Sequence, residues 1–151
     1  MEIRSLLPPP WDSLMPLVEA SRAEGLRFLL RFKDEYLSGQ ARFDYTGDAL
    51  LGAYEGAELI GLCGLTHDPY GAGASVGRVR HLYVRPEWRR RGIGRRLLEE
   101  IEHRASETFD SLVLRTDSMT ASQFYRAVGF ERIAEAGTAT HRHEITRTTS
   151  R

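Results

Sequence analysis

The stretch RRRGIGRRLL, residues 89–98, places five arginines around two glycines and then continues into apolar residues. Arginine guanidinium groups bind phosphate through paired N–H donors, and glycine lets a bulky anion approach the backbone closely. The apolar spacing after the glycines predicts a helix over 92–106. Because the first N–H groups of a helix have no partners within it, the stretch predicts a pyrophosphate site at a helix N-terminus. The alternative that the run alone leaves open is a helix start whose arginines are simply solvated.

This predicted anion site combines loop side chains with the first backbone groups of the helix: Arg89, Arg90, Arg91, Gly92, Ile93, Gly94 and Arg95. Two common phosphate motifs do not fit. A Rossmann fingerprint needs a third glycine where Leu97 stands, and a P-loop needs Gly-Lys-Ser/Thr, which is absent. Trp88, just before the arginines, is expected to pack on the loop.

A second segment with chemical potential is SMTASQFYRAVGF, residues 118–130. It predicts a helix over 118–128, with Ser118 as N-cap and Gly129 at the C-cap. Ala121, Phe124, Tyr125 and Val128 share one face. Tyr125 therefore has two readings, as a core residue of that face or as a phenol that can exchange a proton.

The predicted strand RVRHLYV, residues 78–84, has an irregular apolar pattern. Under strict alternation Val79 points to one face, whereas Leu82 and Val84 point to the other. A β-bulge near Arg80–His81 would bring all three to the same face and free backbone groups for other partners.

These segments must be positioned by a sheet. A strand is expected at 2–7, followed by two helices, of which the second covers 26–37 with Leu26, Leu29, Leu30, Tyr36 and Leu37 apolar. A hairpin is expected at 49–65, turning at 55–58. Further strands are expected at 78–84, 112–114, 130–134 and 140–146. Hairpins require antiparallel pairs and strand–helix–strand units parallel ones, so we predict an α/β fold with a mixed sheet and helices on both faces.

Composition limits the class of protein. The 151 residues are expected to form a single domain, 1–151, and the 21 basic and 21 acidic residues give no net charge. A general nucleic-acid binder is therefore not expected. The N-terminus lacks a signal-like apolar region and no apolar run approaches membrane-spanning length, so a cytoplasmic protein without membrane contact is expected.

Cysteine and histidine offer little independent chemistry. Cys63, the one cysteine, lies in the apolar run LIGLCGL and is expected to be a buried structural residue. His141 and His143 could share a strand face, but no third ligand has suitable spacing, so no metal is expected.

The two motifs together resemble the GNAT N-acetyltransferases. RRRGIG fits that family's pyrophosphate loop, Q/R-x-x-G-x-G/A, and 118–130 is similar to its second signature, N-x-x-A-x-x-F-Y-x-x-x-G-F. The resemblance extends over nearly the whole chain and implies the GNAT acyl-CoA N-acyltransferase fold. It implies an acyltransferase that uses acetyl-CoA as co-substrate and transfers the acetyl group directly to a primary amine of a small molecule or peptide.

The resemblance also implies roles for individual residues. The backbone of Leu82, Tyr83 and Val84 would bind the pantetheine arm, and Tyr125 would protonate the leaving thiolate or hold it by a hydrogen bond. Two positions depart from the pattern. Ser118 replaces the family's asparagine, and Arg78 stands where many relatives have a glutamate, so the general base is not identified.

Several alternatives stay open at this stage. His81 is a replacement base or an ordinary strand histidine. Three acidic residues lie in segments that could border the acceptor cleft, and the sequence does not rank them: Glu35, Asp44 and Asp68. Arg78 and Arg80 form ion pairs or favour an anionic acceptor. His141 is expected near the acceptor, whose pocket segments 26–39 and 68–77 would shape. The alternative function is an acyl-CoA-binding module without turnover. The sequence does not decide which amine is the acceptor or whether acyl groups longer than acetyl are used. It also does not decide whether the protein forms a homodimer, as many members of the family do.

Overall fold

The computed structural model describes residues 1–70, 75–134 and 137–145. Residues 71–74 of the predicted glycine-rich loop and Thr146 of the last predicted strand lie outside the described residues. The elements, in chain order, are β1 Glu2–Ser5, α1 Trp11–Ala23, α2 Phe28–Ser38, β2 Ala49–Glu55, β3 Glu58–His67, β4 Val76–Val84, a 3₁₀ turn Pro86–Trp88, α3 Ile93–Ala105, β5 Ser111–Leu114, α4 Met119–Ala127, β6 Glu131–Arg132 and β7 His141–Glu144.

The described strands form one seven-stranded sheet in the order β1-β2-β3-β4-β5-β7-β6. The predicted hairpin is confirmed, since β2 and β3 pair antiparallel around the turn at Gly56. Strand β4 pairs parallel with β5, as the intervening helix α3 requires. Strands β5 and β6 also flank a helix, but β7 lies between them and pairs antiparallel with both. The predicted mixed sheet is therefore confirmed.

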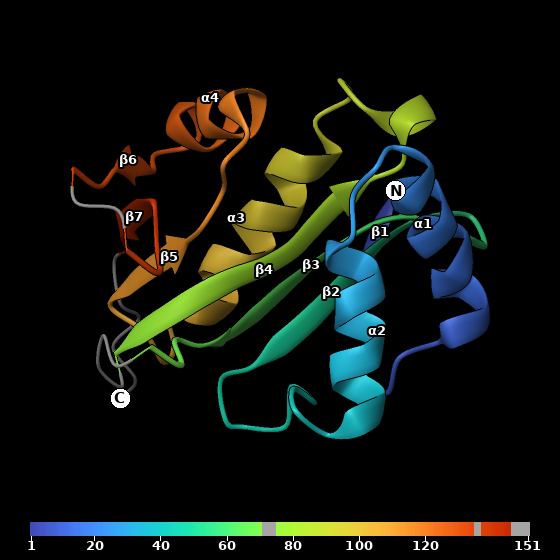
Figure 1. The fold of residues 1–151 in the computed structure, drawn as a ribbon, viewed down its shortest axis with the longest axis horizontal. Coiled ribbons are helices and arrows are strands. Elements are labelled where there is room, and N and C mark those ends of the chain that lie inside the picture. The colour runs from blue at the N-terminus through green and yellow to red at the C-terminus, as the bar shows by residue number, and fades with distance from the viewer. Residues whose placement is uncertain (71–74, 135–136, 146–151) are drawn as a thin grey trace.

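Helices cover both faces of this sheet, as predicted (Figure 1). Alternation along β2 shows the two sides: Leu50 packs with α1 and α2, and Leu51 packs with α3. The predicted inner face of α3 is confirmed as buried, and it consists of Ile93, Leu97, Leu98, Ile101 and Ala105. Cys63 is also buried on the α3 side, as expected.

The predicted apolar face of α2 is partly wrong. Leu29 and Phe32 are buried, but Leu26, Leu30 and Leu37 are exposed by 38%, 38% and 57%. The aromatic residue Phe32 decides the orientation, because its ring packs against Trp11 and Phe43 at centroid distances of 5.5 and 5.9 Å. The helix therefore turns an aromatic stripe toward the sheet and leaves leucines in solvent.

The bulge predicted in β4 is confirmed. Tyr83 is opposite Leu62 and Arg80 is opposite Gly64, so two residues of β4 face one residue of β3. His81, inside the bulge, has a φ of +60°, which is rare for a residue with a side chain. Beyond the bulge Leu82 and Val84 pack on the same side as Val79.

The bulge lies where β4 loses its parallel neighbour. Pairing with β5 ends at Arg78 and Val113, while β4 continues to Val84. Figure 1 shows β4 running on past β5, from which the chain leads away to α4. The sheet is therefore open along the second half of β4.

Gly64 provides a test of packing at the bulge. A Cβ at this position would lie 2.9 Å from Cε1 of Phe43 and 3.3 Å from the carbonyl oxygen of Arg80. We expect Gly64→Ala to lower the free energy of unfolding by about 1–3 kcal/mol, the usual effect of overpacking. Urea unfolding measures this. Gly137→Ala is the control, because no heavy atom lies within 4 Å of a Cβ there. Equal midpoints for both variants would contradict the packing described.

Candidate active site

The loop before α3 contains two residues with left-handed backbone conformation. Arg90 and Gly92 have φ values of +64° and +80°. No side chain caps α3, and the bond from the N–H of Arg96 to the carbonyl of Gly92, at 3.1 Å, is its first helical turn. The N–H groups of Ile93, Gly94 and Arg95 precede that turn and have no helical partner.

The arginines of the loop fall into two groups. Arg89 forms a bidentate ion pair with Glu24, at 2.6 and 2.8 Å, and its Nε donates to the carbonyl of Val84 at 2.9 Å. Four arginines around the start of α3 have no carboxylate within 4 Å among the described residues: Arg90, Arg91, Arg95 and Arg96. Arg89 therefore has a partner that fixes the loop, while four neighbouring charges are unpaired.

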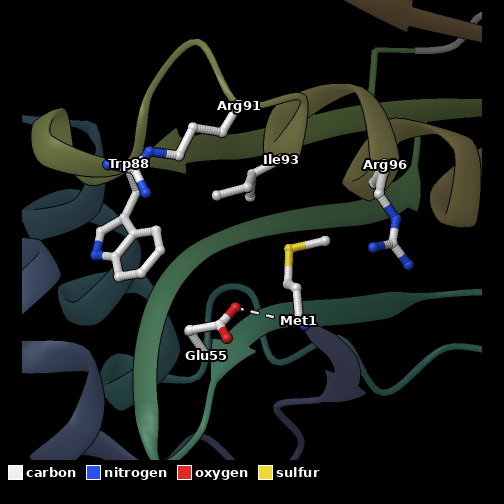
Figure 2. Close-up of a pocket in the computed structure, with 6 residues that line it drawn as sticks. All are labelled: Met1, Glu55, Trp88, Arg91, Ile93 and Arg96. Carbon is white, nitrogen blue, oxygen red and sulfur yellow. Dashed lines mark ion pairs between the residues drawn. The ribbon is translucent and has the colours of Figure 1, made fainter.

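A recess of about 400 Å³ opens beside this loop. Figure 2 shows Arg91 near Trp88 on one side, Arg96 on the other and Ile93 between them. The Arg91 guanidinium lies 4.8 Å from the Trp88 ring centroid, so Trp88 packs on the loop as expected. Across the recess Glu55 pairs with the amino group of Met1 at 3.4 Å. The recess thus presents two arginine charges without an acidic partner.

Along the open edge of β4, alternate backbone N–H groups point away from β3. The N–H of Arg85 donates to the carbonyl of Ile60 on β3 at 2.9 Å. Since successive residues of a strand alternate in direction, the amides of Leu82 and Val84 point to the side that β5 has left. The amide of Tyr83 points toward β3 instead.

The side chain of Tyr83 takes part in a different contact. Its hydroxyl donates to Oε2 of Glu24 at 2.5 Å, and the Arg89 guanidinium lies 5.3 Å from its ring centroid. Arg89 holds the pKa of Glu24 below its usual value through their hydrogen bonds. Burial is the main cause that raises the pKa of Tyr83, and the hydrogen bond to Glu24 is the second. Glu24 therefore links the end of α1 to both β4 and the loop before α3.

Tyr125 lies on the α3 side of the sheet. Its ring packs edge-on against Phe124 and Phe130, at 5.4 and 5.6 Å. Its hydroxyl forms no hydrogen bond to another described residue. The hydroxyl is not fully buried, because it is absent from the buried polar atoms that lack a partner. Burial raises the pKa of Tyr125, and the thiol of Cys63, opposite the bulge, acts in the same direction. The phenol is therefore protonated at neutral pH and free to donate.

His81 lies on the other side of the sheet. Its ring packs against Phe32 at 4.8 Å and Phe43 at 6.1 Å. Burial, followed by the charges of Arg80 and Arg31, lowers the pKa of His81 to about 3. The imidazole is therefore neutral at physiological pH and a weak base.

Helix α4 is positioned by its cap and by His141. The hydroxyl of Ser118 accepts from the N–H of Ala121 at 3.1 Å, so the predicted cap is confirmed. His141 is fully buried, and hydroxyls of Ser122 and Thr140 each lie 2.8 Å from one of its ring nitrogens. His141 therefore joins α4 to β7 as a structural residue.

Gly94 marks where three elements meet. A Cβ on Gly94 would lie 3.4 Å from Cζ of Phe124 on α4 and 3.9 Å from Cγ2 of Val84 on β4. The N-terminus of α3, the open end of β4 and the face of α4 that carries Tyr125 are therefore adjacent. The structure brings the two sequence motifs together.

The sequence alone does not reveal Glu24. It is separated from Tyr83 by 59 residues and from Arg89 by 65, and it belongs to no motif. Within the described residues, no group of three or more His, Cys, Asp or Glu could hold a metal ion, and no helix is long and apolar enough to cross a membrane.

Comparison with known proteins defines the class to which this fold and site belong. A family model described as the acetyltransferase (GNAT) domain matches residues 46–132. Because the match covers more than half of the sequence, the chain belongs to the GNAT acetyltransferase family.

Two relatives in sequence are mycobacterial. The chain is 41% identical over 86 residues to an uncharacterised protein of Mycobacterium leprae, and 36% identical over 90 residues to N-alpha-acetyltransferase RimI of Mycobacterium tuberculosis. Each match covers 55% of this chain, but only 23% and 52% of the relatives. The chain thus spans about a quarter and about half of their lengths.

Solved structures have the same fold. A protein from Exiguobacterium sp. 255-15, assigned to the acetyltransferases, superposes with a TM-score of 0.81 at 29% identity, over 95% of this chain and 92% of that one. PaiA N-acetyltransferase from Thermoplasma acidophilum, in complex with coenzyme A, has a TM-score of 0.65 at 23% identity, over 95% and 98%. The second likeness concerns the fold alone.

The pairing of Glu24 with Arg89 predicts a pH-dependent contribution to stability. A carboxyl whose pKa is depressed in the folded protein stabilises it above the unfolded pKa of about 4 and loses this effect as pH falls further. We expect wild type to exceed Glu24→Gln by about 1 kcal/mol at pH 7, with the difference shrinking below pH 4. Urea unfolding at several pH values measures this.

The control for that measurement is Glu19→Gln, because Glu19 pairs with Arg22 at 3.5 Å and both side chains are exposed. This variant should differ little from wild type at any pH. A Glu24→Gln difference that did not change with pH would show that charge pairing is not its source.

Proposed function

We propose that this protein is an N-acetyltransferase that transfers the acetyl group of acetyl-CoA directly to a primary amine of a small molecule or peptide. The observation that carries the proposal is the opening of the sheet beside the bulge in β4, with the uncapped N-terminus of α3 and Tyr125 next to it. Acetyl-CoA would supply the thioester carbonyl and a thiolate leaving group.

The loop before α3 has the chemistry to hold a pyrophosphate. The N–H groups of Ile93, Gly94 and Arg95 are unpaired by helix geometry, and the helix dipole makes this end positive. The unpaired arginines add side-chain donors, and Arg91 with Arg96 lines the adjacent recess. In this proposal Arg89 positions the loop through Glu24 and does not itself bind phosphate.

The open edge of β4 has the donors that the arm of the cofactor and the reacting carbonyl need. The outward amides of Leu82 and Val84 can pair with the pantetheine arm as a neighbouring strand would. An amide at the same edge can stabilise the negative charge that develops on the carbonyl oxygen. The carbonyl of Val84 is already engaged by Arg89, which holds this residue in place.

Tyr125 is the proposed donor to the departing thiolate. Because its pKa is raised by burial, the phenol is a weak acid and acts first as a hydrogen-bond donor that holds the thiolate. The amine must lose a proton before it attacks, since a primary ammonium has a pKa of about 10.4. His81 is neutral but a weak base, so we propose that it contacts the acceptor while water carries the proton away.

A second candidate function is an acyl-CoA-binding module without turnover. The observation in its favour is that Arg78, where many relatives have a glutamate, is occupied by an ion pair with Asp68. Position 78 itself therefore offers no carboxylate that could act as a general base, and the nearby carboxylate of Asp68 is engaged by Arg78. Turnover and binding must be measured separately to distinguish the two functions.

The binding step is tested by Gly92→Asp beside Gly92→Asn. Both variants place a side chain of the same shape at a φ of +80°, where nothing lies within 4 Å of a Cβ. Only aspartate adds a negative charge next to the proposed pyrophosphate. We expect its Kd for acetyl-CoA, measured by calorimetry, to be at least about tenfold weaker than that of the asparagine variant. Equal Kd values would remove the loop from the binding site.

The chemical step is tested by Tyr125→Phe. We expect kcat to fall about 10²-fold, within the usual contribution of general acid catalysis, and the Kd for acetyl-CoA to remain unchanged. Tyr45→Phe is the control, because Tyr45 is 74% exposed. An unchanged kcat would remove Tyr125 from the mechanism. A wild type that binds acetyl-CoA but acetylates no amine would support the binding module.

A further inference from the structure

Two arginines point to the face of β4 that α2 covers. Val79 packs on the opposite, α3 side, so its neighbours Arg78 and Arg80 face α2. The charge of Glu35 on α2 acts on Arg80, which agrees with this placement. This side of the sheet is opposite Tyr125.

Arg78 is buried, and not all of its N–H groups have a hydrogen-bond acceptor among the described residues. Its side chain is 6% exposed, and its Nε donates to Oδ1 of Asp68 at 2.9 Å. The guanidinium lies 4.8 Å from the ring centroid of Tyr70. One of its terminal nitrogens, Nη2, is fully buried and has no hydrogen-bond partner among the described residues. A buried charged donor without an acceptor is unfavourable, so an acceptor arriving there would stabilise the protein.

Arg80 is half-buried and lacks an acidic partner. Its Nε donates to the hydroxyl of Thr66 at 2.9 Å, and no carboxylate lies within 4 Å of it among the described residues. Burial, followed by the charge of Arg78, lowers the pKa of Arg80. Within 4 Å the two guanidinium groups therefore share one carboxylate, that of Asp68, while the charge of Glu35 on α2 acts on Arg80 from farther away.

The position of Arg80 relates its charge to the reaction. Arg80 directly precedes the bulge residue His81 and lies opposite Gly64. Leu82, whose amide faces the open edge, follows two residues later, about 7 Å along a strand. An anion at Arg80 would therefore lie one short molecule away from the proposed acetyl position.

We propose that the acceptor amine carries a carboxylate, which Arg80 and the unpartnered Nη2 of Arg78 bind on the α2 side of the sheet. This inference rests on the proposed function and specifies its acceptor. A carboxylate matches the site because no carboxylate of the described residues contacts Arg80 directly, and its two oxygens suit guanidinium donors. A phosphate monoester would bring about two charges to the same place.

The test uses acceptors that differ in one group. Linear ω-amino carboxylates of increasing chain length are compared with the corresponding carboxamides, with the full chain and saturating acetyl-CoA. Wild type should show kcat/KM values at least about tenfold higher for the carboxylate of the best-fitting length, the effect of a charge-assisted hydrogen bond. The chain length at the optimum measures the distance between amine and anion sites.

Variants assign any preference to Arg80. We expect the ratio of kcat/KM values, carboxylate over carboxamide, to fall to about one in Arg80→Gln and to an intermediate value in Arg80→Lys. Arg104→Gln removes one positive charge at the far end of α3, where Arg104 pairs with Glu100 at 3.7 Å, and should keep the wild-type ratio.

The outcomes separate this inference from the proposed function. Equal use of carboxylate and carboxamide by wild type, or a preference that survives in Arg80→Gln, overturns the inference while acetyl transfer stands. If Arg80→Gln does not fold, the wild-type ratio and Arg80→Lys decide the question. Absence of acetylation of every acceptor, with acetyl-CoA bound, overturns the proposed function and this inference together.

Discussion

The separation of β4 from β5 after Arg78 and Val113 is the constraint on which the rest of the site depends. Backbone groups inside a sheet are normally paired, and unpaired ones are unfavourable unless solvent or a ligand satisfies them. Here the bulge at His81 changes which side chains of β4 face α3, just beyond the point where pairing with β5 ends. Apolar side chains stay on the α3 side, while the amides of Leu82 and Val84 remain available. Local irregularity in one strand thus leaves a strand edge without a neighbouring strand.

Charge pairing divides the arginines into structural and available ones. Although the chain has no net charge, Arg90, Arg91, Arg95 and Arg96 lie together with no acidic partner in the described part of the chain. Arg89, next to them in sequence, is paired with Glu24, which also accepts from the hydroxyl of Tyr83. The same cluster connects α1 to the loop before α3. One face of the sheet can therefore influence the position of the loop on the other.

The two faces of the sheet carry different chemistry at the level of the bulge. Tyr125 and the N-terminus of α3 lie on one side, among apolar residues. His81 and the guanidinium of Arg80 lie on the other, beside α2. The direct transfer proposed above requires the reacting ends of two substrates to meet while their bodies stay apart. In that proposal they meet at the opening beside β4.

Local patterns determined the elements, because periodicity and capping act over a few residues. They gave the order of strands and helices, the buried face of α3, the cap at Ser118 and the parity break in β4. Only tertiary structure decided that Leu26, Leu30 and Leu37 are exposed, since aromatic packing of Phe32 sets the orientation of α2. It likewise decided which arginines are free. An ion pair such as Glu24 with Arg89 joins residues far apart in the chain, and spacing in sequence carries no record of such a contact.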